Sequence, residues 1–184
     1  LYDFGNGEGY AISLDENKSV RLKLDKYQSY VIVLDGDCAD LPKYEISSPT
    51  GEIKCNFKIE TAAYNDIDNY KLFAESVSSE SLPNITGAKA DPHFSGVIRY
   101  TAKLDSLKGK KLILSEVGST AEMWLNGKNL GIRYSYPYAF DIKDAVRDGE
   151  NELVIEVSNT LANTIRDYFS KFLAIPRSGL FGPI

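Results

Sequence analysis

The sequence has few of the residues on which metal and nucleophilic chemistry depend. Among its 184 residues are 2 cysteines and 1 histidine. These are too few for a structural zinc site or a disulfide scaffold. Cys38 and Cys55 either pair with each other or stay ordinary buried thiols, and the second interpretation is favoured. Any catalytic triad built on histidine would have to use His93.

A long apolar run and a basic cluster are also missing. No stretch approaches the roughly 18 consecutive apolar residues of a transmembrane helix, so we expect no membrane span. The chain has 21 Lys and Arg residues against 26 Asp and Glu residues, a net charge of −5. This acidic balance argues against a nucleic-acid partner. Because 43% of the residues are hydrophobic, a packed globular core is expected.

What the sequence does have is alternation of apolar and polar residues, which is typical of β-strands. Strands are predicted in the runs 19–24, 30–34, 51–60, 97–104, 111–117, 120–125 and 153–157. In the run before Asn126, alternate residues Ala121, Met123 and Leu125 are expected on one face. Asn126-Gly127 predicts a tight hairpin turn. Short strands separated by such turns predict an all-β antiparallel sandwich or barrel.

Two segments lack this alternation. Residues 62–92 contain serine-rich and proline-containing stretches and are predicted to form a long irregular connection. Residues 159–172 have apolar residues near helical spacing and are predicted to form either a helix or an ordered loop. A connection as long as residues 62–92 usually indicates either a functional surface or a poorly ordered segment.

The second half contains a recognisable ordered set of blocks. They are His93-Phe94-Ser95-Gly96, Ala121–Gly131, Tyr138–Ile142, Asp148–Thr160 and Ser178–Pro183. With these blocks the chain resembles the galactose-binding-like β-sandwich of glycoside hydrolase family two and of large enzymes similar to α-L-rhamnosidases. The resemblance implies a jelly-roll domain over residues 51–184. Residues 1–48 resemble, more distantly, the C-terminal part of the β-rich domain that precedes it.

The resemblance also carries a functional expectation. In such enzymes the catalytic acids lie on a separate barrel of about 250 residues, which this chain is too short to contain. Both ends of the sequence look like the interior of a longer protein. We therefore expect a non-catalytic accessory domain of a larger glycoside hydrolase, which binds carbohydrate or supports the catalytic domain. The alternative is a structural or protein-interaction β-sandwich without glycan affinity.

The same resemblance implies the partners and the location. Carbohydrate and other domains of the same longer chain are the expected partners, with no nucleic acid and no membrane. An extracellular or periplasmic location is typical of such enzymes. The charge balance and the lack of a long apolar run also argue against nucleic-acid and membrane partners, whereas the residues themselves do not indicate the location.

Sugar recognition needs flat aromatic faces together with planar polar groups, and the sequence offers both. Aromatic faces come from a tyrosine cluster after a predicted strand, and polar groups come from residues 159–167. If that segment is helical, Asn159, Asn163 and Asp167 share one face. The alternative roles are packing, docking against other domains and the capping of turns. The candidate carbohydrate-binding residues are Tyr134, Tyr136, Tyr138, Asn159, Asn163, Arg166 and Asp167.

Catalytic and metal sites are not expected. The acid pairs Asp66 with Asp68 and Asp141 with Asp144 belong to no catalytic motif, and they fit solvated turns better. The block that begins at His93 lacks the Gly-x-Ser-x-Gly elbow of serine hydrolases. No cofactor is predicted. The resemblance leaves room for a structural calcium ion, for which Asp66, Asp68 and Asn69 supply oxygens without EF-hand spacing.

Overall fold

The computed structural model describes residues 1–4, 7–26, 28–34, 36–46, 50–165 and 175–184. Within these ranges every paired strand is antiparallel to its neighbour, which confirms the all-β prediction. The chain divides into two compact units. The first comprises residues 1–50 with 135–137, and the second comprises 51–134 with 138–184. None of the helices in the described ranges has the length and apolar character that crossing a membrane requires.

The first unit is built around a small sheet of very short strands. β1 (Tyr2–Asp3) lies between β2 (Glu8–Gly9) and β3 (Tyr30–Val31). The strand predicted over residues 19–24 is absent from the described structure, and Leu24 is 59% exposed. Alternation in this run was therefore misleading, because it is not matched by a buried face on which the apolar side chains could pack.

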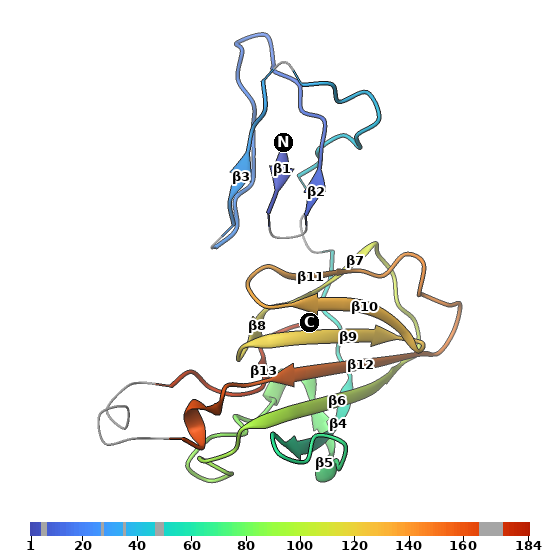
Figure 1. Cartoon of the computed structure of the whole chain (residues 1–184). Helices are drawn as coiled ribbons and strands as arrows, with labels where there is room; N and C mark the ends of the chain where they lie inside the picture. Colours follow the sequence, from blue (N-terminus) through green and yellow to red (C-terminus); the bar gives the residue numbers. More distant parts are fainter. Residues whose placement is uncertain (5–6, 27, 35, 47–49, 166–174) are drawn as a thin grey trace. The chain divides into compact units, whose positions relative to one another are not determined.

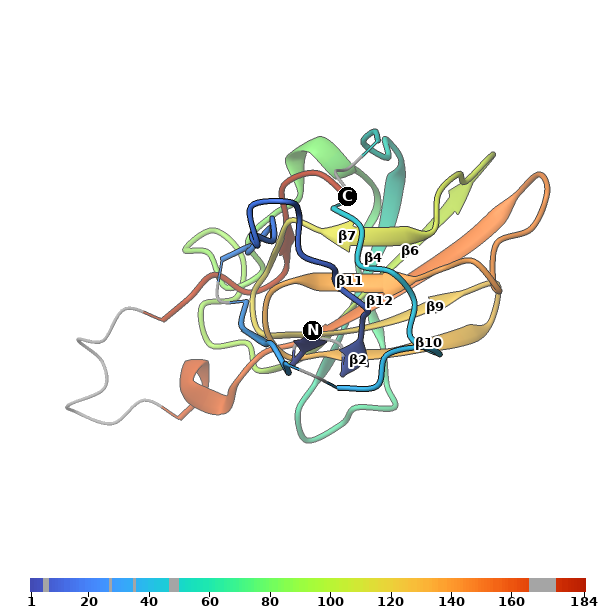
Figure 2. The ribbon, with the colours of Figure 1, turned by 90° about the horizontal axis from the view of Figure 1, so that it is seen from above.

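The second unit contains a six-stranded sheet in the order β10-β9-β12-β6-β4-β5. The strands run side by side in Figure 1, and β9, β10 and β12 are again adjacent in Figure 2. Their bounds are β4 Asn56–Ala63, β5 Lys71–Ser78, β6 Gly96–Leu104, β9 Thr120–Leu125, β10 Lys128–Arg133 and β12 Asn151–Ser158. β12 comes last in the sequence among these six strands, yet it lies between β9 and β6, which both precede it.

Two short sheets complete the sandwich. β7 (Lys111–Leu114) pairs with β11 (Tyr138–Asp141), and β8 (Glu116–Val117) pairs with β13 (Leu180–Phe181). The backbone N–H of Leu180 in β13 donates to the buried hydroxyl of Tyr100 in β6 at 3.1 Å. The short sheets and the large sheet are thus joined inside the second unit.

The core follows from the predicted alternation. Along β9, Ala121, Met123 and Leu125 are fully buried, as predicted. In the register of the sheet, Met123 lies beside Ile155 of β12, and Ile155 lies beside Tyr100 of β6. Apolar side chains therefore form continuous rows across the middle of the sheet. Burial of each large side chain in such a row contributes about 1.5–3 kcal/mol.

The hairpin prediction is also confirmed. Asn126 and Gly127 connect β9 to β10 with φ values of 54° and 79°. Both values lie in the left-handed region, where asparagine and glycine are the residues of lowest strain.

The prediction for residues 62–92 was wrong in part, because β5 forms within this range. β5 is the edge strand of the large sheet, and both of its faces are largely exposed, with Leu72 at 53% and Phe73 at 39%. A strand without one fully buried face needs no strict alternation. Outside β5, the segment contains turns and the short 3₁₀ helix η1 (Ser79–Ser81).

Candidate carbohydrate pocket

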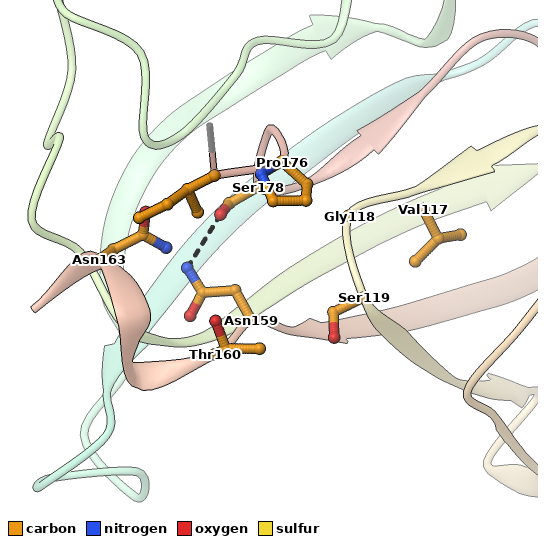
Figure 3. Close-up of a pocket in the computed structure, with 9 residues that line it drawn as sticks. Val117, Gly118, Ser119, Asn159, Thr160, Asn163, Pro176 and Ser178 are labelled. Atoms are coloured by element: carbon orange, nitrogen blue, oxygen red, sulfur yellow. Dashed lines mark hydrogen bonds between the residues drawn. The ribbon is translucent and has the colours of Figure 1, made fainter. Parts of the chain in front are cut away.

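A pocket of about 200 Å³ opens at the end of the sandwich where β12 finishes. Its walls come from the corner between β8 and β9, the turn after β12 and the segment that leads into β13 (Figure 3). The lining residues are Val117, Gly118, Ser119, Asn159, Thr160, Asn163, Ile175, Pro176 and Ser178. The described part of the lining therefore consists of amides, hydroxyls and apolar groups, and none of these described side chains is ionisable.

The corner between β8 and β9 depends on Gly118. Its N–H donates to the carbonyl of Gly179 at 2.8 Å. A Cβ atom at this position would lie 2.3 Å from the carbonyl oxygen of Arg177. Only glycine fits so close to another backbone. The wall beside the pocket is thus fixed by direct contact between two chain segments.

Asn159 ties this end of the sheet together. Its Nδ2 donates to the Phe94 carbonyl at 2.9 Å and to Ser178 Oγ at 3.0 Å, and its Oδ1 accepts from the Gly96 N–H at 2.8 Å. Figure 3 shows the contact between Asn159 and Ser178 inside the pocket. The planar amide of Asn159 is therefore largely occupied by protein partners.

Asn163 lies on the opposite wall, at the end of the 3₁₀ helix η2 (Leu161–Asn163). The helix is held to the sheet through Ser95, whose hydroxyl donates to the Thr160 carbonyl at 3.0 Å and accepts from the Thr164 N–H at 3.2 Å. Asn163 is 2% exposed. This short helix places Asn163 in the lining of the same pocket as Asn159 (Figure 3).

The helix or loop predicted over residues 159–172 is thus, in its described part, a turn followed by η2. Asn159 and Asn163 come together in the pocket, although no continuous α-helix places them on one face. Arg166 and Asp167 lie outside the described residues. Their predicted contact with sugar remains a prediction.

The tyrosines occupy three different environments. Tyr134 is 77% exposed, Tyr136 is half-buried in the first unit, and Tyr138 is 8% exposed in the second unit. The hydroxyl of Tyr138 donates to the carbonyl of Ser119 at 2.6 Å, and burial raises the pKa of this phenol. Tyr138 therefore supports a residue that lines the pocket. Sugar contact by the tyrosines remains a prediction.

The sequence did not single out Ser119 or Thr160, although both line the pocket. Ser178 was quoted only as part of a family block. A signal for the corner was present, because Gly118-Ser119 separates two apolar strand runs. No sequence pattern indicates, however, that this corner faces the end of β12.

The acid pairs lie on exposed turns. Asp141 forms an ion pair with Lys143 at 3.0 Å, and Asp144 lies 4.0 Å from Lys128. Asp66 and Asp68 are exposed, and Asp66 accepts a hydrogen bond from the side chain of Asn69. Within the described ranges, no group of three or more His, Cys, Asp or Glu side chains could hold a metal ion.

The remaining reactive side chains are not assembled into a triad. His93 is exposed before β6, and the hydroxyl of neighbouring Ser95 donates to the Thr160 backbone instead. Cys38 and Cys55 are both free thiols, and Cys38 is exposed rather than buried as expected.

A second hollow of about 400 Å³ lies in the first unit, and among its described lining residues Asp15 is the one acidic residue. Asp15 Oδ1 accepts from the N–H groups of Asn17 and Ser19 in its own loop.

Comparison with known proteins relates this chain to parts of long glycosidase-type proteins. No family model matches the sequence. Over 80 residues the chain is 34% identical to a Formosa agariphila protein named "Putative beta-glucuronidase", covering 40% of this chain and 7% of that protein. The fold is similar to that of a rhamnosidase from Novosphingobium sp. PP1Y, with a TM-score of 0.55, 23% identity, and coverage of 79% of this chain and 16% of that one. The chain thus spans a small fraction of the length of either protein.

Proposed function

We propose that the second unit is a non-catalytic accessory domain of a larger glycoside hydrolase and that it contacts carbohydrate. The observation that carries this proposal is the chemistry of the pocket. Its described lining residues offer amides and hydroxyls that bind sugar hydroxyls, but no carboxyl group. Glycoside hydrolysis requires two carboxyl groups on either side of the scissile bond. A pocket with this lining can bind a sugar without cleaving it.

The comparisons support the association with glycoside hydrolases. Two proteins with glycosidase names share either part of the sequence or the fold, and each is much longer than this chain. An accessory β-sandwich within a longer enzyme accounts for both the small coverage and the missing acid pair. An extracellular or periplasmic location follows from this proposal.

Hydrolysis assays test the non-catalytic role. The purified chain is incubated with nitrophenyl glycosides that include the β-glucuronide and the α-rhamnoside, beside an active glycosidase as a positive control. We expect no release of nitrophenol above the buffer blank. Turnover that co-purifies with the chain and disappears when its acidic residues are substituted would contradict the proposal.

A second candidate function is a docking module without glycan affinity, and one observation favours it. Edge strand β5 exposes Leu72 and Phe73, and exposed apolar side chains on a sheet edge are unusual unless another element covers them. Under this alternative, substitution of both residues by lysine weakens association with a neighbouring domain and leaves sugar binding at zero. Sugar titration of the unmodified chain separates the two functions.

A further inference from the structure

The side-chain amide of Asn163 has an unusual environment. It is 2% exposed, and among the described residues it makes no hydrogen bond to another residue. No described side-chain nitrogen or oxygen that is completely shielded from solvent lacks a partner. The amide therefore meets its hydrogen-bonding needs from the space in the pocket that it lines.

If neither water nor a ligand in the pocket bonded to the Asn163 amide, its burial would destabilise the folded state. A fully buried amide that forms no hydrogen bond is less stable than the same amide in water. The neighbouring Asn159 avoids this cost because the protein supplies its partners. Asn163 has no such partner, so water or a ligand in the pocket must take that place.

Other unused polar groups line the same pocket. The hydroxyls of Ser119 and Thr160 make no hydrogen bond to any described residue. Figure 3 shows Ser119, Thr160 and Asn163 arranged around Asn159. A ligand in the pocket can thus meet several donors and acceptors at once. Val117, Ile175 and Pro176 supply apolar surface beside them.

The chemistry of these groups defines the ligand. A primary amide donates through its nitrogen and accepts through its oxygen, so it can bind two adjacent hydroxyls of one sugar ring. The apolar residues can contact the C–H groups of the ring. Because none of the lining side chains in the described ranges is charged, a carboxylate on the ligand would be desolvated there without a cationic partner among them. The volume of about 200 Å³ lies below the 300–1,000 Å³ that is usual for drug-sized ligands.

From these observations we propose that the pocket binds a single uncharged sugar ring and that Asn163 is the residue that recognises its hydroxyls. This inference rests on the proposed accessory function and names the class of ligand. It assigns Asn159 to the architecture of the pocket and Asn163 to binding.

The test is a titration of the ¹⁵N-labelled chain with methyl glycosides of neutral hexoses and with methyl glucuronide. Neutral glycosides are expected to bind in the millimolar range and to shift the Asn163 side-chain NH₂ signals and the Gly118 and Ser119 backbone signals. The glucuronide is expected to bind at least tenfold more weakly. Asn163→Leu and Asn163→Asp should each weaken binding of the neutral ligand at least tenfold.

Asn56→Leu is the matched control, because Asn56 is an exposed asparagine in the same unit at the opposite end of β4 from the pocket. It should bind as tightly as the unmodified chain. The inference is overturned if no neutral glycoside shifts the Asn163 signals, if the glucuronide binds equally well, or if both Asn163 variants keep full affinity. The shifts in the unmodified chain decide the matter even if a variant fails to fold.

The two proposals fail in different ways. Absence of sugar-induced shifts, with no hydrolysis, removes the sugar site and the carbohydrate contact of the proposed function, but leaves the non-catalytic role standing. Hydrolysis by the chain itself contradicts the accessory role regardless of what the pocket binds.

Discussion

The two ends of β12 each have a cluster of asparagines, and the clusters differ in how their amides are used. At the start of the strand, Asn151 and Asn126 bond to each other and to surrounding backbone. Just beyond its end, Asn159 is similarly occupied, whereas Asn163 is not. The same residue type therefore holds the fold at one end and is available for recognition at the other.

The asparagine cluster at the start of β12 is built around Asn151, which is 0% exposed. Its Nδ2 donates to the carbonyls of Arg147 and Gly149, both at 2.9 Å. Its Oδ1 accepts from the Arg147 N–H at 2.8 Å and from Asn126 Nδ2 at 2.7 Å. Two turns far apart in the sequence are thus joined by a single amide. The predicted Asn126-Gly127 turn and the turn that contains Gly149 thus belong to one structural cluster.

The largest expected effect comes from breaking this cluster. Asn151→Ala removes four part-buried hydrogen bonds, three to the backbone of Arg147 and Gly149 and one to the side chain of Asn126. We expect the free energy of unfolding to fall by about 3 kcal/mol. Urea denaturation measures it, with Asn56→Ala as an exposed control. A loss no larger than that of the control would show that the cluster is not a structural centre.

At the other end of the strand, Asn159→Ala is expected to have a somewhat smaller effect. It removes the bonds to Phe94, Gly96 and Ser178, but the site is only half-buried, so water can replace part of them. The expected loss is about 2 kcal/mol in the same urea assay. An unchanged midpoint would mean that Asn159 does not hold this end of the sheet.

The substitution Asn163→Leu tests most directly whether Asn163 differs from Asn159 in its contribution to stability. Because no protein partner of the amide is lost, the free energy of unfolding should change by less than about 1 kcal/mol. The substitution has similar shape and adds apolar contact with the pocket wall. Destabilisation as large as that of Asn159→Ala would assign Asn163 to the architecture and remove the basis for its role in recognition.

The smallest effect concerns an ionisable cluster midway along β12. Glu156 Oε1 accepts from Arg99 at 2.7 Å and from the Tyr70 hydroxyl at 3.0 Å. Burial, and then the bond to the Glu156 carboxylate and its charge, raise the pKa of Tyr70 to about 12, against the opposing influence of Arg99.

An unfolded tyrosine ionises near pH 10, so between about pH 10 and 12 the unfolded state loses a proton that the folded state keeps. This contribution to stability is fully present below about pH 10 and is lost as the pH rises. Tyr70→Phe should therefore make the alkaline decline in urea stability slightly shallower, after normalisation at pH 7. An equal slope in both proteins would contradict the assignment.

The sequence predicted the sandwich because strict alternation survives wherever a strand has one buried face, as along β9 and β12. It did not predict β5, which lies at an exposed edge, and it wrongly predicted a strand over residues 19–24. Alternation of apolar and polar residues reflects the burial of one face of a strand. It is therefore an unreliable sign of a strand where the strand or its apolar side chains are exposed.

The candidate site was predictable only in part. The asparagines could be proposed as polar groups, but their different roles depend on partners that are distant in the sequence, such as Phe94 and Ser178. Hydrogen-bond saturation is a property of the assembled fold. For the same reason Ser119 and Thr160 were not recognised.

The position of β12 also affects how the protein forms during synthesis. Its neighbours β9 and β6 both emerge from the ribosome earlier, and neither pairs with the other in the finished sheet. Until residues 151–158 are made, the inner edges of β9 and β6 therefore lack the strand with which they pair in the finished sheet. Translation that stops before this point yields fragments whose exposed edges favour aggregation over folding.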